Sequence, residues 1–154
     1  MIDYRKANKN DIQEISLMRV AMICDNGQYD DDFKEKLYQN TSKYMQKGLS
    51  DNSVSLWVAA VDNKIIAMCC LNYFYLPPNE MSLSGKSAHL GNMYTVPSYR
   101  NRGIASKLLE IIVAEAKDNK CDRILLIPTE IGEPLYKKFG FQPWFGAMVF
   151  FPTK

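Results

Sequence analysis

The chain has 154 residues, of which 47% are hydrophobic and 23% are charged, a composition typical of a folded domain and unlike disordered, collagenous or coiled-coil chains. Its 19 Lys and Arg and 17 Asp and Glu give a formal net charge of +2. That near balance argues against a dedicated nucleic-acid binder, which needs a basic stripe to displace counterions. The length, and the lack of a visible linker or repeat, predict a single domain, residues 1–154.

The uncharged segments are too short to span a membrane. The two longest, Ile65–Asn79 and Phe139–Thr153, have 15 residues each and contain proline and polar residues. A spanning helix needs about 18 to 20 predominantly apolar residues. The N-terminal sequence MIDYRKANKND has no apolar stretch of the kind found in secretory signals. We therefore expect a cytoplasmic protein with no membrane partner.

The four cysteines, Cys24, Cys69, Cys70 and Cys121, have no metal-like spacing with the single histidine, His89. Because no secretory context is visible, we expect free thiols in a reducing compartment and no bound metal. Cys69 and Cys70 are adjacent in an apolar run, where the side chains of a strand alternate between its two faces.

The first half of the chain predicts a strand, two helices and a β-hairpin. Asp11 stands three residues before Glu14, which predicts a capping box at the start of the first helix. The hairpin strands would meet at a turn formed by Asp62-Asn63, and the second strand is too apolar to have a solvated face. The expected elements are the strand Ile2–Ala7, the helix after Asp11, the helix 33–47, and the strands Ser53–Ala60 and Ile65–Tyr75.

The second half alternates between strands and helices. Gly91-Asn92 interrupts the next strand, which predicts a bulge there. The expected elements are the strand Ala88–Val96, the amphipathic helix Gly103–Lys117, the strand Arg123–Ile127, a short helix with Pro134 in its first turn, and one or two strands in Phe141–Phe151. The order β-α-α-β-β-β-α-β-α-β predicts an α/β fold with a mixed sheet and a β-α-β crossover near the middle of that sheet.

The segment Val96–Ala105 joins a hydrophobic strand to the most amphipathic helix, so it places the free amides and the positive end of that helix beside a loop. Arg100 and Arg102 add charge, and Gly103 allows backbone to approach an anion. Neither of the commoner phosphate motifs, GxxxxGK[ST] and GxGxxG, is present. Taken alone, the loop is equally consistent with a solvated turn.

Two motifs together resemble the GNAT superfamily of N-acetyltransferases. Arg100-Asn101-Arg102-Gly103-Ile104-Ala105 is similar to its acyl-CoA-binding motif, Arg/Gln-x-x-Gly-x-Gly/Ala. About 35 residues later, Leu135-Tyr136-Lys137-Lys138-Phe139-Gly140-Phe141 looks like the family's Leu-Tyr-x-x-x-Gly-Phe signature. The order of predicted elements matches the family over essentially the whole chain.

The resemblance implies acetyl-CoA as co-substrate, bound where two parallel strands splay apart. The first strand would offer backbone to the pantetheine arm, and the loop would hold the pyrophosphate. The implied cofactor-binding residues are Met93, Tyr94, Thr95, Arg100, Asn101, Arg102, Gly103, Ile104, Ala105 and Ser106.

The resemblance also implies transfer of an acetyl group to a primary amine by direct attack on the thioester. Tyr136 matches the family tyrosine near the sulfur and is our candidate general acid, the alternative being a tyrosine that only packs a short helix. Many relatives carry a glutamate base on the strand before the loop, whereas HLGNMYTV contains no carboxylate. Glu130 is the nearest acidic candidate for the base, the alternatives being a solvated Glu130, a chain of waters, or His89, for which a structural role is favoured.

The acceptor stays open between a small-molecule amine and a peptide amine. Four aspartates in the segment 25–32 could attract a polycation, although Asp30–Asp32 are favoured as residues that stabilise the start of the second helix. The missing strand glutamate keeps a second function open, that of a non-catalytic acyl-CoA-binding sensor or interaction domain. The sequence also leaves open the length of the acyl group and whether the chain forms a homodimer.

Overall fold

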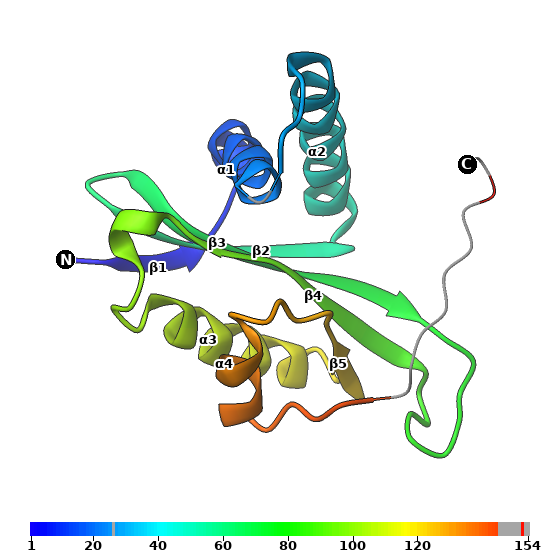
Figure 1. Ribbon diagram of the computed structural model, residues 1–154. Helices are drawn as coiled ribbons and strands as arrows, with labels where there is room; N and C mark the ends of the chain where they lie inside the picture. The colour runs from blue at the N-terminus through cyan, green and yellow to red at the C-terminus, as the bar shows by residue number, and fades with distance from the viewer. Residues whose placement is uncertain (26, 145–151, 153–154) are drawn as a thin grey trace.

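The computed structural model describes residues 1–25, 27–144 and 152. A five-stranded mixed sheet separates helices α1 and α2 on one face from α3 and α4 on the other (Figure 1). The elements are β1 (Asp3–Lys6), α1 (Ile12–Cys24), α2 (Asp31–Asp51), β2 (Val54–Val61), β3 (Lys64–Tyr75), β4 (Lys86–Thr95), α3 (Ile104–Asp118), β5 (Arg123–Leu125) and α4 (Glu133–Lys138), with short 3-10 turns at Lys9–Asp11 and Pro97–Tyr99. This order confirms the predicted α/β class and the first nine predicted elements.

The strands follow their sequence order across the sheet, from β1 to β5. The first three pairings are antiparallel, and β4 pairs with β5 in parallel. Helix α3 connects the two parallel strands and covers the sheet below them (Figure 1). The predicted β-α-β crossover is therefore present, but among the described strands it joins the last two of the sheet and does not lie near its middle.

Strand β4 contains the predicted bulge. Met68 of β3 lies opposite Tyr94, but Cys70 lies opposite Gly91, so β4 contributes one more residue than β3 between these two pairs. Asn92 adopts the left-handed conformation, with φ +53°, and accommodates the extra residue. The bulge therefore rotates the strand just before the loop that joins it to α3.

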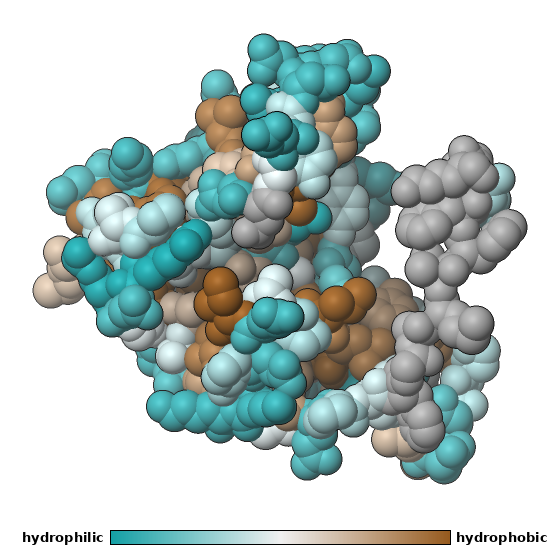
Figure 2. All heavy atoms as spheres, viewed as in Figure 1, coloured by the Kyte–Doolittle hydropathy of each residue, from teal (hydrophilic) through white to brown (hydrophobic). Residues whose placement is uncertain are grey.

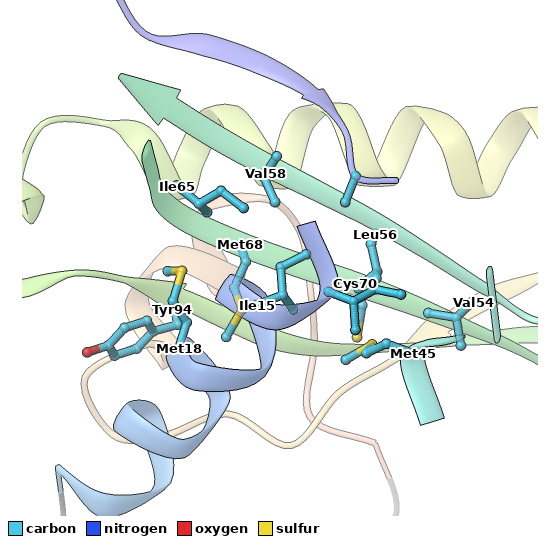
Figure 3. Close-up of a cluster of buried hydrophobic side chains, with 12 residues drawn as sticks. Ile15, Met18, Met45, Val54, Leu56, Val58, Ile65, Met68, Cys70 and Tyr94 are labelled. Atoms are coloured by element: carbon cyan, nitrogen blue, oxygen red, sulfur yellow. The ribbon is translucent and has the colours of Figure 1, made fainter. Parts of the chain in front are cut away.

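Two hydrophobic clusters pack on opposite faces of the sheet. Figure 3 shows the first, in which Ile15 and Met18 of α1 and Met45 of α2 lie against side chains of the sheet. The second packs α3 and α4 against the other face. Strand β3 is buried continuously from Ile65 to Leu71 because both of its faces are covered.

The predictions of free thiols and of opposite faces for Cys69 and Cys70 are confirmed. All four cysteines are free, and the adjacent Cys69 and Cys70 belong to the clusters on opposite faces of the sheet. Burial is the main cause that raises the pKa of Cys70 to about 11 and that of Cys69 well above its usual value. Both thiols are therefore protonated and pack as small apolar side chains.

The predicted capping box of α1 is wrong. A short 3-10 turn precedes the helix, so the box forms three residues earlier, between Asn8 and Asp11. Asp11 accepts a hydrogen bond from the Asn8 amide at 2.8 Å and two from the Arg5 guanidinium, and this pairing with Arg5 lowers the pKa of Asp11. Glu14 instead reaches the sheet, where its carboxylate accepts the Ile65 amide at 2.9 Å.

The predicted boundaries shift at two further places. Helix α2 extends beyond the expected 33–47 because Asp30 caps its start and Asn52, in the left-handed conformation, ends it. The closing strands expected in Phe141–Phe151 fall partly on residues 145–151, which lie outside the described residues, and residues 141–144 belong to no strand.

A buried carboxylate joins α3 to the first two strands. The Glu115 side chain is only 10% exposed and contacts the Lys6 ammonium at 2.6 Å. It also accepts hydrogen bonds from the Ser55 hydroxyl and from the Trp57 indole N–H. Because these donors would otherwise lack a partner in a half-buried place, the carboxylate stabilises the packing of the helix on the sheet.

Glu115→Ala should lower the free energy of unfolding by about 1 to 3 kcal/mol, because it leaves the Ser55 and Trp57 donors unsatisfied. Glu110→Ala is the matched control, since Glu110 is exposed on the same helix and, among the described residues, pairs only with Lys107. Its cost should stay below about 1 kcal/mol. Urea unfolding of both variants measures the difference, and equal losses would contradict the role of Glu115.

Candidate functional site

A cavity of about 300 Å³ lies where β4 ends and α3 begins. It brings together nine of the ten residues that the sequence predicted to bind the cofactor, and two residues that it did not, Tyr99 and Ile131. The lining residues are Met93, Tyr94, Thr95, Tyr99, Arg100, Asn101, Gly103, Ile104, Ala105, Ser106 and Ile131. We call this the loop cavity.

The start of α3 presents free backbone donors to the loop cavity. The amides of Ile104, Ala105 and Ser106 have no acceptor among the described residues. Gly103 caps the helix with φ +75°, and a Cβ built there would meet no atom within 4 Å. The helix dipole adds positive potential at the same place, so the cavity has the chemistry of an anion site.

The two arginines of the loop are held differently. Arg100 donates from Nε to the Thr95 carbonyl at 3.0 Å and lies over the Tyr94 ring. Arg102 donates to the Ser98 carbonyl at 2.9 Å and lies over the Tyr99 ring. Only Arg100 lines the loop cavity, and Arg102 is the one predicted cofactor residue that does not.

Asp25 contacts two residues that line the loop cavity. Nothing in the sequence distinguished its role from that of Asp30–Asp32. Its carboxylate accepts a hydrogen bond from the Tyr94 hydroxyl at 3.0 Å and lies 3.6 Å from the Arg100 guanidinium. Burial, followed by the hydrogen bond to Asp25, raises the pKa of Tyr94. The Tyr94 hydroxyl is therefore protonated near neutral pH and acts as a donor.

The other three aspartates of this segment stabilise α2, as the sequence favoured. Asp30 accepts the Phe33 amide at 2.8 Å, and Asp31 and Asp32 pair with Lys34 and Lys36 on the same helix. Their charges are thus matched locally within the first turns of α2.

Strands β4 and β5 separate before the loop cavity. Their pairing covers only Ser87–His89, so β4 has no strand partner on that side from Leu90 to Thr95 among the described residues. Figure 2 shows hydrophobic side chains gathered over the segment between β5 and α4, whereas the outer end of α2 is hydrophilic. Ile127 and Ile131 in that segment are 88% and 94% exposed. An open backbone edge therefore lies beside exposed apolar surface.

Tyr136 and Glu130 occupy different environments. Tyr136 is half-buried on α4, packs against the cluster beneath α3 and meets the Phe141 ring edge-on at 5.8 Å. Burial raises the pKa of Tyr136, so its phenol holds its proton. Glu130 lies on the exposed turn before α4. Neither residue lines the loop cavity.

A second cavity, of about 380 Å³, lies on the other face of the sheet between the helices α1 and α2 and the bulged part of β4. We call this the helix-side cavity. Its lining residues are Arg19, Leu37, Asn40, Thr41, Tyr44, Met45, Cys70, Asn72, His89, Gly91 and Asn92. Burial lowers the pKa of His89, which makes its imidazole neutral near pH 7. A third cavity, of about 470 Å³, lies apart from β4, between residues 9–13 and α2.

The described residues contain no group of His, Cys, Asp and Glu side chains that could hold a metal ion. No helix among them is long and apolar enough to cross a membrane.

Comparison with known proteins decides the family. The model of the acetyltransferase (GNAT) family matches residues 16–141. This range includes the strands that line the loop cavity and the helix-side cavity, and the whole loop between β4 and α3. The chain belongs to the GNAT acetyltransferase family. A solved structure of a predicted acetyltransferase with acetyl-CoA from Clostridium acetobutylicum is 32% identical, with a TM-score of 0.87 over 97% of this GNAT chain and 96% of that one.

More distant structures share the fold of this GNAT domain. A GCN5-related N-acetyltransferase from Ralstonia eutropha JMP134 is 24% identical and has a TM-score of 0.87, with 98% of this chain and 99% of that chain covered. A possible acetyltransferase from Clostridium difficile 630 is 16% identical with a TM-score of 0.78, and the comparison covers 100% and 99% of the two chains. No curated protein matches the sequence.

Proposed function

We propose that this GNAT protein transfers the acetyl group of acetyl-CoA to the primary amine of a small molecule or peptide. The observation that carries the proposal is the loop cavity, where the free amides at the start of α3 lie beside the unpaired edge of β4. The family match supports an acetyltransferase, and the 32% identical Clostridium acetobutylicum structure, described with acetyl-CoA, supports the donor.

The residues around the loop cavity fit the parts of acetyl-CoA. The pyrophosphate would accept hydrogen bonds from the amides of Gly103–Ser106, and Arg100 would add a charge-assisted contact. The pantetheine arm carries amides that can pair with the backbone of Met93–Thr95, as an added strand would. It would also cover the exposed Ile127 and Ile131, which removes apolar surface from water.

The proposed reaction is direct attack of a neutral amine on the thioester carbonyl. A C–N bond forms, the C–S bond breaks, and the amine loses a proton to a base. The thiolate that leaves takes a proton from Tyr136, whose half-buried phenol is protonated near neutral pH. Backbone amides near the bulge of β4 would bind the developing oxyanion.

Two side chains are candidates for the base. Glu130, the residue expected from the sequence, lies on an exposed turn outside both cavities. His89 lines the helix-side cavity on the strand that also borders the loop cavity, and burial favours its neutral form. The geometry therefore favours His89 over Glu130, and a His89→Gln variant compared with Glu130→Gln separates the two.

The decisive experiment incubates the protein with acetyl-CoA and a panel of amines and follows release of free thiol. Turnover with at least one amine is the expected outcome. If acetyl-CoA raises the melting temperature but no amine supports turnover, the chain is instead a non-catalytic acyl-CoA-binding module.

Tyr136→Phe should lower kcat by roughly 10²- to 10⁴-fold, the usual contribution of a positioned general acid. The ring and its contact with Phe141 are retained, so the KM for acetyl-CoA should change little. Tyr75→Phe, on an exposed tyrosine at the end of β3, serves as the control and should leave kcat unchanged. An undiminished rate in Tyr136→Phe would remove this residue from the mechanism.

Gly103→Val should abolish acetyl-CoA binding, because the branched side chain would fill the space over the free amides of α3. Gly140→Val is the matched control, since Gly140 also has a positive φ, +88°, and open space around its Cβ position. Both substitutions strain the backbone, but only the first lies in the loop cavity. Calorimetric titration with acetyl-CoA tests this, and unchanged affinity in folded Gly103→Val would exclude the assigned phosphate site.

A further inference from the structure

The helix-side cavity lies next to the reacting end of the proposed donor site. Gly91 and Asn92 of the β4 bulge form part of its wall, and the next residue, Met93, lines the loop cavity. The two cavities thus border the same strand on either side of the bulge. An acceptor held in the helix-side cavity can therefore approach a thioester that is bound along β4.

The helix-side cavity is electropositive. Arg19 is the only charged side chain among the described residues that line it, and no Asp or Glu is among them. Arg19 is half-buried, and no ion pair or hydrogen bond joins its guanidinium to a described residue. Its charge reaches the interior of the cavity, because it opposes the burial that raises the pKa of Tyr44 to about 12 and of Cys70 to about 11.

The aspartates at the end of α1 and the start of α2 are engaged elsewhere. Asp25 faces Tyr94 and Arg100, while Asp31 and Asp32 pair with lysines of α2. A half-buried guanidinium without a carboxylate loses hydration and regains no ion pair. The cavity is therefore complementary to an anion supplied by a ligand.

Asn72 places a second polar group without a described partner, a hydrogen-bond acceptor, in the wall of the same cavity. Its Nδ2 donates to the His89 carbonyl at 3.2 Å, but its buried Oδ1 has no hydrogen-bond partner in the described part of the chain. Buried polar atoms in proteins are normally hydrogen-bonded, so this oxygen lacks a partner that a ligand N–H would supply once the Asn72 side chain turns it toward the cavity. Guanidinium and amide oxygen together match a ligand that has both an anionic group and an amine.

We propose that the acceptor is a small amine that also carries a carboxylate, with the carboxylate bound by Arg19 and the amine N–H donated to Asn72 Oδ1. This inference rests on the proposed acetyl transfer. It replaces the polycation that the aspartates of residues 25–32 suggested, because Arg19 would repel such a substrate. The positive potential also favours the neutral, nucleophilic form of the amine.

The test compares amino acids with their decarboxylated counterparts at saturating acetyl-CoA. Suitable pairs are phenylalanine with phenethylamine, lysine with cadaverine and β-alanine with ethylamine, and spermidine represents polycations. We expect kcat/KM to be at least about tenfold higher for carboxylate-bearing members, the scale of one charge-assisted hydrogen bond in a half-buried site.

Arg19→Gln should erase that preference by raising the KM for the carboxylate-bearing amine at least about tenfold, while the KM for acetyl-CoA is unchanged. Arg19→Lys should restore part of it, because it keeps the charge without the bidentate geometry. Lys47→Gln is the matched control: it removes an exposed charge from α2 outside the cavity and should leave the preference intact.

The possible failures are distinguishable. If amines without a carboxylate react as well, or Arg19→Gln keeps the preference, the inference is overturned and acetyl transfer stands. If no amine reacts, calorimetric titration of the same pairs into the CoA-saturated protein decides. If carboxylate-bearing amines then bind selectively and Arg19→Gln abolishes that binding, recognition of the carboxylate by Arg19 is supported although acetyl transfer fails. If no selective binding is seen, both the inference and the proposed acetyl transfer are overturned.

Discussion

The parallel pairing of β4 with β5 stops at His89, and the organisation of the candidate site depends on that ending. Beyond it, β4 has backbone groups on that side that no described strand uses, and the loop after β4 leads to the free amides at the start of α3. Unpaired backbone donors and acceptors need a partner, and an extended amide-containing ligand provides one. The bulge at Gly91-Asn92 lies at the same point and turns the strand so that it borders cavities on both of its faces.

The sheet keeps the two halves of the proposed reaction apart. Strand β3, buried on both faces, divides the hydrophobic core into a cluster beneath α1 and α2 and a cluster beneath α3 and α4. The loop cavity lies toward the start of α3, and the helix-side cavity lies under α1 and α2. The donor and the acceptor can therefore be recognised by separate surfaces and meet only at the bulged strand.

The near-neutral net charge of +2 conceals local differences in charge between the two cavities and the core. Arg100 contributes positive charge to the loop cavity and is partly balanced by Asp25. Arg19 contributes a positive charge to the helix-side cavity and has no such balance among the described residues. Glu115 differs from Arg19, because its buried carboxylate is paired with Lys6 and hydrogen-bonded by Ser55 and Trp57. It stabilises the packing of α3 on the sheet and does not face a cavity for a ligand.

The sequence by itself determined the order of the described elements, the double burial of β3 and the bulge, because each depends on periodicity or on the conformational freedom of neighbouring residues. It also placed the loop with Gly103 before an amphipathic helix, but that loop alone was equally consistent with a solvated turn, and its interpretation as an anion site came from the resemblance to the GNAT family. Only the tertiary structure decided that Asp25 meets Tyr94, that Glu14 reaches Ile65 and that Arg19 shares a cavity with Asn72. Such contacts join residues about 50 to 70 positions apart, as the two hydrogen bonds show. They follow from how α1 packs on the sheet, and no local pattern encodes that packing.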